Sequence, residues 1–162
     1  MILGLLSKEI QEFITNSLQS NIAKLALSKN PFPEVEWKEI LTQIVSKNKA
    51  RTKLSTWFKT ENIYYPSSLS IEQSSSESTA KFKSSLVKGE TLVDLTGGFG
   101  VDCYYFSQHF TTVFHCEKNQ ELADIAAYNF KQLNKNNVKC IAGDSAVFLE
   151  NNNSTFDWIY VD

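Results

Sequence analysis

The sequence predicts an α/β fold in two parts, a small α-helical domain at residues 1–65 and a parallel sheet with its helices at residues 66–162. Two observations lead to this prediction. Apolar residues near the start recur at helical spacing, and from residue 91 onward short apolar segments alternate with segments of helical pattern. The chain has 162 residues, of which 42% are hydrophobic, so it can bury a core without disulfides or a structural metal.

The first part has the pattern of two amphipathic helices. In residues 3–29 the apolar side chains follow one another at spacings of three and four, which places them on one helical face, with a break expected near residues 16–20. The two prolines of residues 30–33 end this stretch, because proline and the residue before it disfavour a helix. A second amphipathic helix is expected next, with the apolar side chains of residues 37–45 on one side. Its first turns contain Glu34, Glu36 and Glu39, which the helix dipole favours there.

The middle of the chain is rich in serine. Nine serines lie between residues 67 and 85, a composition that is typical of a solvated linker. Ser74, however, stands three residues before Glu77, which is the spacing of a capping box. We therefore expect an ordered loop and a short helix that begins at Ser74, with the linker as the alternative.

From Thr91 onward, short apolar segments alternate with segments of helical pattern. Strands are predicted at residues 91–95, 112–116, 138–142 and 157–161, and helices at residues 100–109, 119–133 and 144–150. Alternation at these intervals favours a parallel sheet with right-handed crossovers. The last predicted strand ends directly before the end of the chain, from which we expect that the sheet is incomplete here.

The most informative segment is a glycine-rich turn after the first predicted strand. Half of the six glycines lie there, at Gly97, Gly98 and Gly100. Glycine lets the backbone adopt positive φ and approach a ligand closely, and the helix that follows offers free N–H groups to a polar or anionic ligand. The alternative is a tight turn that binds nothing, but the first strand–helix connection of a parallel sheet is where such folds bind nucleotides.

Two acidic residues stand where the second and third predicted strands end. Glu117 follows Gly100 by 17 residues, at the place where an acid hydrogen-bonds the ribose hydroxyls of an adenosine. The alternative for Glu117 is a solvated acid beside Lys118. Asp144, followed by Ser145, could accept a hydrogen bond from an adenine amino group, and it could equally be the N-cap of the helix that follows.

The form of the glycine turn distinguishes between two adenosine cofactors. A dinucleotide fingerprint requires GxGxxG, and Cys103 stands in place of its third glycine. Residues 94–102 resemble instead the glycine loop of class I S-adenosylmethionine-dependent methyltransferases, although Thr96 occupies the place of the first loop glycine. The resemblance implies a Rossmann-like sheet and S-adenosyl-L-methionine as the cofactor. It implies cofactor-binding roles for Asp94, Thr96, Gly97, Gly98, Gly100, Glu117, Lys118, Asp144 and Ser145.

More specifically, the chain resembles the bacterial family of class I methyltransferases that carry a C-terminal THUMP-like domain. The resemblance rests on residues 69–83, 94–102, 117–122 and 157–162, with Asn129. In that family the serine-rich segment helps to enclose the cofactor, which implies that Gln73 and Ser74 contribute to its binding. THUMP-type domains are associated with RNA modification, so the resemblance also implies RNA as the methyl acceptor.

Asp162 is the candidate catalytic residue by the same resemblance. In that family the fourth strand ends in an Asp-Pro motif, where related enzymes hold the nucleophilic nitrogen of the substrate in line with the sulfonium methyl group. Such a transfer needs alignment, an acceptor for the amino proton and electrostatic support. The resemblance further implies that only the first four strands are present, and that later strands, the rest of the acceptor site and the C-terminal domain follow Asp162 in a longer protein. With that part of the acceptor site missing, the resemblance implies that this chain could be inactive alone.

The charges of the chain are unevenly distributed. Residues 1–83 carry 11 basic and 8 acidic side chains, a net charge of +3, and residues 84–162 carry 5 basic and 10 acidic ones, a net charge of −5. A basic run could contact RNA phosphates, although a solvated helix end is the favoured interpretation. This run consists of Lys47, Lys49, Arg51 and Lys53.

The cysteines and histidines give no sign of a metal site. The chain has an odd number of cysteines and no CxxC pair, which favours reduced thiols in a cytoplasmic protein. The three cysteines are Cys103, Cys116 and Cys140. His109 and His115 have no acid or cysteine at the spacing of metal ligands, so we expect both to be structural or surface residues. No apolar run approaches the roughly 18 residues of a membrane span, and the short apolar start lacks the basic flank of a secretion signal.

The sequence also allows two alternatives to a methyltransferase. An NAD-binding enzyme could use the same sheet, since the acid after the second strand would serve either cofactor. A non-catalytic Rossmann-like module could use it for binding alone.

Overall fold

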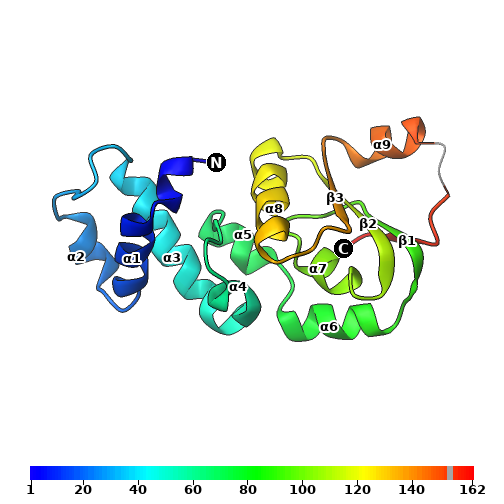
Figure 1. Ribbon diagram of the computed structural model, residues 1–162, viewed down its shortest axis with the longest axis horizontal. Coiled ribbons are helices and arrows are strands. Elements are labelled where there is room, and N and C mark those ends of the chain that lie inside the picture. Colours follow the sequence, from blue (N-terminus) through cyan, green and yellow to red (C-terminus); the bar gives the residue numbers. More distant parts are fainter. Residues whose placement is uncertain (153–154) are drawn as a thin grey trace. The chain divides into compact units, whose positions relative to one another are not determined.

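The computed structural model describes residues 1–152 and 155–162 (Figure 1). The chain divides into two compact units, unit 1 at Met1–Glu72 and unit 2 at Gln73–Asp162. This division lies later in the chain than the boundary expected at residue 65, because α5 (Ser68–Gln73), the first helix of the serine-rich segment, belongs almost entirely to unit 1.

Unit 1 is built from helices. A short 3-10 helix at Leu3–Leu6 precedes α1 (Lys8–Asn16), α2 (Ile22–Ala26), α3 (Trp37–Lys53), α4 (Ser55–Lys59) and α5. The predicted break falls between α1 and α2, where the Asn21 side chain accepts a hydrogen bond from the Lys24 backbone N–H and so starts α2 as its N-cap. Among the described residues, no helix of either unit is both long and apolar enough to cross a membrane.

The core of unit 1 joins apolar side chains from several of these helices. The fully buried ones include Leu5, Ile10, Ile14, Ile40, Leu54 and Trp57. A buried side-chain amide fixes the segment that follows α4. Gln43 donates to the Tyr65 carbonyl oxygen at 2.6 Å and accepts from the Tyr65 backbone N–H at 2.9 Å. Both backbone groups of Tyr65 are thereby satisfied in a part of the chain that forms neither helix nor strand.

Unit 2 alternates helices and strands. After α6 (Glu77–Ser85) come β1 (Gly89–Asp94), α7 (Val101–Phe106), β2 (Phe110–Glu117), α8 (Gln120–Gln132), β3 (Val138–Ala142), α9 (Ser145–Asn151) and β4 (Trp158–Tyr160). The strands form one parallel sheet in the order β3-β2-β1-β4. The predicted α/β fold with a Rossmann-like parallel sheet of four strands is confirmed.

Two helices pack against one face of this sheet, and α9 contacts the other face. On one face, side chains of α7 and α8 pack against β1 and β2 in a single apolar cluster of Leu92, Cys103, Phe106, Phe110, Val113, Ala126 and Phe130. Successive residues of a strand point to opposite faces, so Phe114, next to Val113, points to the other face. There its ring lies 5.8 Å from that of Phe148 on α9. Because the four strands are parallel, their carboxyl ends meet at one edge of the sheet.

The predicted start of the helix in the serine-rich segment was wrong by two residues. The N-cap of α6 is Ser76, whose Oγ accepts from the Thr79 backbone N–H at 3.1 Å, and not Ser74. Glu77 is therefore the first helical residue rather than the third, and it is only 8% exposed. Any serine hydroxyl can cap a helix, and the buried face of α6, which includes Glu77 and Ala80, sets where the helix begins.

Candidate functional site

The predicted site residues of unit 2 gather at the carboxyl edge of the sheet. Asp94 ends β1 and Glu117 ends β2, while Asp144 and Asp162 each follow the last residue of their strand by two positions. Because the strands are parallel and neighbours in the order β3-β2-β1-β4, these four acids come from four adjacent strand ends.

Asp94 lies inside the turn that follows β1. Its Oδ1 accepts from the Thr96 backbone N–H at 2.9 Å and from Thr96 Oγ1 at 3.1 Å, and its Oδ2 accepts from Cys103 Sγ at 3.2 Å. The residue is 1% exposed, and this burial raises the pKa of the Asp94 carboxyl, although His115, Thr96 and Cys103 oppose the rise. Asp94 thus holds the turn together from within.

Two glycines of the turn are needed because buried rings lie against them. A Cβ atom at Gly97 would lie 2.5 Å from His115 Nε2, and one at Gly100 would lie 2.5 Å from the Phe130 ring. His115 is fully buried, and its Nε2 donates to the Gly98 carbonyl oxygen at 3.0 Å. His115 is therefore a structural residue that supports the turn from below, which is one of the two roles expected for it.

Gly98 differs from its neighbours because it borders open space. It has a φ of +54°, and a Cβ atom there would meet nothing closer than the Thr96 carbonyl oxygen at 3.7 Å. Its backbone N–H donates to Glu117 Oε2 at 3.0 Å, and the Asn119 backbone N–H donates to Glu117 Oε1 at 2.7 Å. The half-buried Glu117 carboxylate thus joins the end of β2 to the open side of the glycine turn.

Asp144 caps α9, as one of its two predicted roles requires. Its Oδ1 accepts from the Ala146 backbone N–H at 2.9 Å, and its Oδ2 lies 3.5 Å from Lys118 Nζ. The backbone N–H groups of Ala146 and Val147, and then Lys118, lower the pKa of the Asp144 carboxyl. Ser145 is the first residue of α9. A hollow of about 360 Å³ adjoins Asp144, and its lining includes Ile141, Gly143, Val147 and Phe148.

Gln73 and Ser74 lie in the segment that leads into α6. Gln73 is exposed at the end of α5, and Ser74 is half-buried. The neighbouring Ser75, which the sequence did not single out, donates from its Oγ to Asp102 Oδ2 on α7 at 2.8 Å. The serine-rich segment is therefore attached to the helix that follows the glycine turn.

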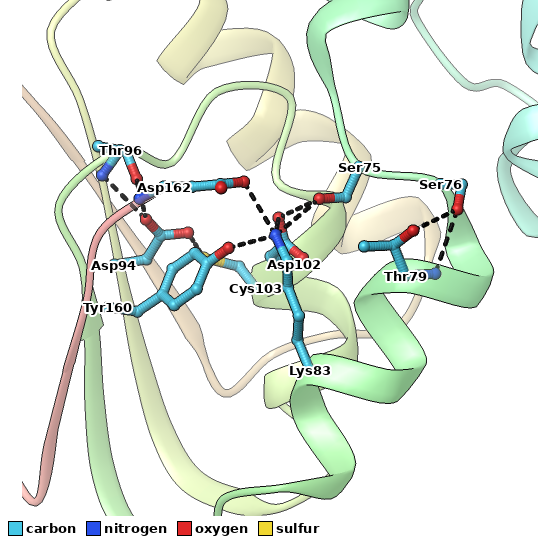
Figure 2. A network of polar contacts seen from close by, with 10 residues as sticks. All are labelled: Ser75, Ser76, Thr79, Lys83, Asp94, Thr96, Asp102, Cys103, Tyr160 and Asp162. Atoms are coloured by element: carbon cyan, nitrogen blue, oxygen red, sulfur yellow. Dashed lines mark hydrogen bonds and ion pairs between the residues drawn. The ribbon is translucent and has the colours of Figure 1, made fainter.

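A cluster around Lys83 was not recognised in the sequence (Figure 2). From α6, Lys83 Nζ donates to Ser75 Oγ at 3.0 Å, to Asp162 Oδ2 at 2.9 Å and to the Tyr160 hydroxyl, and it lies 3.5 Å from Asp102 Oδ2. We call Ser75, Lys83, Asp102, Tyr160 and Asp162 the Lys83 cluster. Its members come from separate parts of the chain, so no local spacing could have predicted it.

The groups of the Lys83 cluster influence one another's protonation. Burial alone lowers the pKa of Lys83, but the hydrogen bonds to Tyr160 and Asp162 and the charge of Asp102 outweigh it, so this pKa lies above its ordinary value. Burial raises the pKa of Tyr160 to about 12, although Lys83 opposes the rise. The hydrogen bond from Lys83 lowers the pKa of the Asp162 carboxyl.

Asp162 is held to the glycine turn as well. Its backbone N–H donates to Thr96 Oγ1 at 3.0 Å, and the same hydroxyl donates to Asp94. Thr96, which stands where the resembling family has a glycine, thus links the ends of β1 and β4 through its side chain.

Side chains of the basic run in α3 have partners within unit 1. Lys49 forms an ion pair with Glu72, Lys53 donates to the Glu72 carbonyl oxygen, and Lys47 donates to Thr15 Oγ1 at 3.0 Å. Within residues 1–152 and 155–162, no group of three or more His, Cys, Asp or Glu side chains is arranged to hold a metal ion.

Comparison with known proteins shows one informative similarity. No family model matches the chain, and no curated protein does either. A crystal structure of a candidate methyltransferase from Porphyromonas gingivalis W83 is similar over 98% of this chain, with 30% identical residues and a TM-score of 0.82. The match covers 40% of that protein, so this chain spans less than half of the length of its structural relative.

Proposed function

We propose that this chain is the cofactor-binding portion of an S-adenosylmethionine-dependent methyltransferase. The observation that carries the proposal is the similarity to a candidate methyltransferase over 98% of the chain at 30% identity. The local geometry supports it independently, because the glycine turn and the acids after β1, β2, β3 and β4 lie at the edge where Rossmann-like sheets bind adenosine ligands.

The residues at this edge fit such a cofactor. The open side of Gly98 leaves room for a ligand against the turn. Glu117 already accepts two backbone hydrogen bonds, but a carboxylate offers about four acceptor positions, so it can also accept from ribose hydroxyls. Asp144 and Lys118 would flank the adenine, beside the hollow lined by Gly143 and Val147.

The bound cofactor would supply a methyl group already activated on a sulfonium centre. The chain itself then has to bind the cofactor, align the acceptor nitrogen with its methyl group and provide an acceptor for the amino proton. The glycine turn would face the methionine part of the cofactor. Asp162, two residues after β4, would accept a hydrogen bond from the acceptor amino group.

The proposal extends to the longer protein, which would methylate RNA and carry a THUMP-like domain. It also includes a cytoplasmic location. The charge of +3 in residues 1–83 supports an anionic acceptor. The three free cysteines support a reducing compartment. Transfer of a labelled methyl group to total RNA by the longer protein tests the acceptor, and labelled protein or small molecules without labelled RNA would contradict it.

Calorimetry on this chain tests which cofactor it binds. We expect S-adenosylmethionine to bind with one site per chain and NAD to give no binding heat. Glu117→Ala removes a charged hydrogen-bond acceptor, which contributes about 1.5–3 kcal/mol per bond, and should weaken the binding at least about tenfold. Glu150→Ala, which removes an exposed acid of α9, is the matched control and should bind as the unaltered chain does.

Three results would contradict the proposal. Binding of NAD alone would favour the alternative of an NAD-binding enzyme. Unchanged S-adenosylmethionine affinity in Glu117→Ala would show that the ligand binds elsewhere, and binding without any methyl transfer by the longer protein would favour a non-catalytic module.

A further inference from the structure

The Lys83 ammonium joins parts of unit 2 that are distant in the sequence. It contacts Tyr160, 77 residues further along the chain, and Asp162, 79 residues further. Its ion pair with Asp102 connects the same group to α7, the helix that follows the glycine turn. One side chain of α6 thus bridges the proposed cofactor helix and the proposed acceptor edge (Figure 2).

The cluster has more negative than positive charge. Lys83 stands between the carboxylates of Asp102 and Asp162, and among the described residues no other cation forms an ion pair with either of them. The side chain of Asp102 is 12% exposed, and its Oδ1 is buried without a hydrogen-bond partner in the described part of the chain. Asp102 therefore depends on Lys83 and Ser75 for compensation of its charge.

Asp162 depends on Lys83 in a different way. Its side chain is 59% exposed, so water could solvate the carboxylate in several rotamers. The Thr96 hydroxyl holds its backbone N–H, and Lys83 Nζ holds Oδ2. The two contacts together set the direction of an otherwise exposed carboxylate.

We propose that Lys83 is a positioning residue, which holds the Asp162 carboxylate in the orientation that receives the methyl acceptor. This role rests on the proposed function, because it matters for catalysis only if Asp162 faces the acceptor. A contact at Oδ2 does not exhaust the acceptor positions of a carboxylate, so Asp162 can be held by Lys83 and still accept an N–H from a substrate.

The charge of Lys83 gives this role a chemical consequence. The hydrogen bond from Lys83 lowers the pKa of the Asp162 carboxyl, so Asp162 stays ionised and acts only as an acceptor over a wider pH range. Another titratable group that faces Asp162 is Tyr160, from β4, whose hydrogen bond also lowers the pKa of the Asp162 carboxyl. Asp102, from α7, shares Lys83 with Asp162, so one cation has to compensate for both carboxylates.

The test measures the pKa of the Asp162 side chain by carbon-detected NMR on the full chain without cofactor, with Asp162→Asn to assign the resonance. Lys83→Met keeps most of the side-chain length and removes the charge. We expect it to raise the pKa of Asp162 by about one unit or more. Lys83→Arg keeps the charge and should leave this pKa low. Lys81→Met removes a lysine of the same helix, whose Nζ lies over the Tyr105 ring, and should change nothing at Asp162.

The outcomes separate this role from the proposed function. An unchanged pKa of Asp162 in Lys83→Met, in a chain that binds S-adenosylmethionine, would overturn the role of Lys83 and leave the proposed function standing. A raised pKa in a chain that binds no S-adenosylmethionine would overturn the proposed function while supporting the Lys83–Asp162 contact. If Lys83→Met does not fold, the unaltered chain decides, because a pKa of Asp162 at or above the ordinary value of about 3.9 would overturn the proposal.

Catalysis provides a second readout in the longer protein. Lys83→Met should lower kcat more than it raises KM for the cofactor, because the Asp162 carboxylate that it misplaces acts on the methyl acceptor and not on the cofactor. The loss should be partly recovered in Lys83→Arg. An equal loss in both variants would contradict positioning through charge.

Discussion

The glycines after β1 differ in what surrounds them, although the sequence presents them as one motif. Gly97 makes room for the His115 ring and Gly100 for the Phe130 ring, so both are required by packing of the protein on itself. Gly98 borders open space and donates its N–H to Glu117. A ligand is therefore expected to approach the turn at Gly98.

Alanine substitutions at two of these glycines should separate packing from ligand approach. Gly100→Ala introduces a Cβ at 2.5 Å from the Phe130 ring at a φ of +87°, and Gly98→Ala meets open space at a φ of +54°. Both variants have the cost of a left-handed alanine, and only Gly100→Ala adds overpacking to it. We therefore expect the free energy of unfolding to fall by about 2–4 kcal/mol in Gly100→Ala and by about 1 kcal/mol in Gly98→Ala. Urea denaturation measures both, and equal losses would contradict the assigned packing role of Gly100.

Several site residues could be identified from the sequence because their position along the chain is informative. The glycines and Glu117 follow predicted strands, and residues at strand ends of a parallel sheet meet at one edge. The role of Lys83 could not be identified in this way, because its partners Tyr160 and Asp162 lie far along the chain. Long-range contacts of one side chain leave no periodic signal in a sequence.

At the scale of elements, α6 shows how a helix start is chosen among equivalent residues. Ser74, Ser75 and Ser76 are chemically alike, and the capping-box spacing favoured the first of them. In the structure Ser76 caps the helix and Ser75 reaches Asp102 on α7. The three serines thus have different surroundings, which are set by the way α6 packs beside α7 (Figure 1).

The cap of α6 can be tested by amide hydrogen exchange. Ser76→Ala removes the acceptor of the Thr79 backbone N–H, a cap that contributes about 1 kcal/mol. We expect the Thr79 amide to exchange several times faster in Ser76→Ala and at an unchanged rate in Ser74→Ala. Faster exchange of the Glu77 amide in Ser74→Ala, with the Thr79 amide unchanged in Ser76→Ala, would restore the original prediction.

The strands were predicted more accurately than the helix ends. The pattern of short apolar segments located all four strands. The structure keeps both predicted ends of β3 and moves the ends of the other strands by one or two residues. The helix after the glycine turn was expected at residues 100–109 and ends at Phe106. Helix ends depend on caps and on tertiary packing, which local propensity does not determine.

At the scale of the whole chain, the uneven charge acquires a structural meaning. The acidic half includes Asp94, Glu117, Asp144 and Asp162, and all four lie at the carboxyl edge of one sheet. Every candidate cofactor residue belongs to unit 2, at Gln73–Asp162. Repulsion among the acids is reduced locally, since Lys118 pairs with Asp144 and Lys83 with Asp162.

Amide chemical shifts recorded while S-adenosylmethionine is added to this chain test the central claim most directly. If the cofactor binds at the carboxyl edge of the sheet, the amides of Gly98, Lys118 and Ser145 should shift with one common affinity. Amides at the opposite edge, such as Glu90 and Thr111, should not move, and NAD should produce no shifts. Shifts confined to unit 1 or to the opposite edge, or no shifts at millimolar cofactor, would contradict the account.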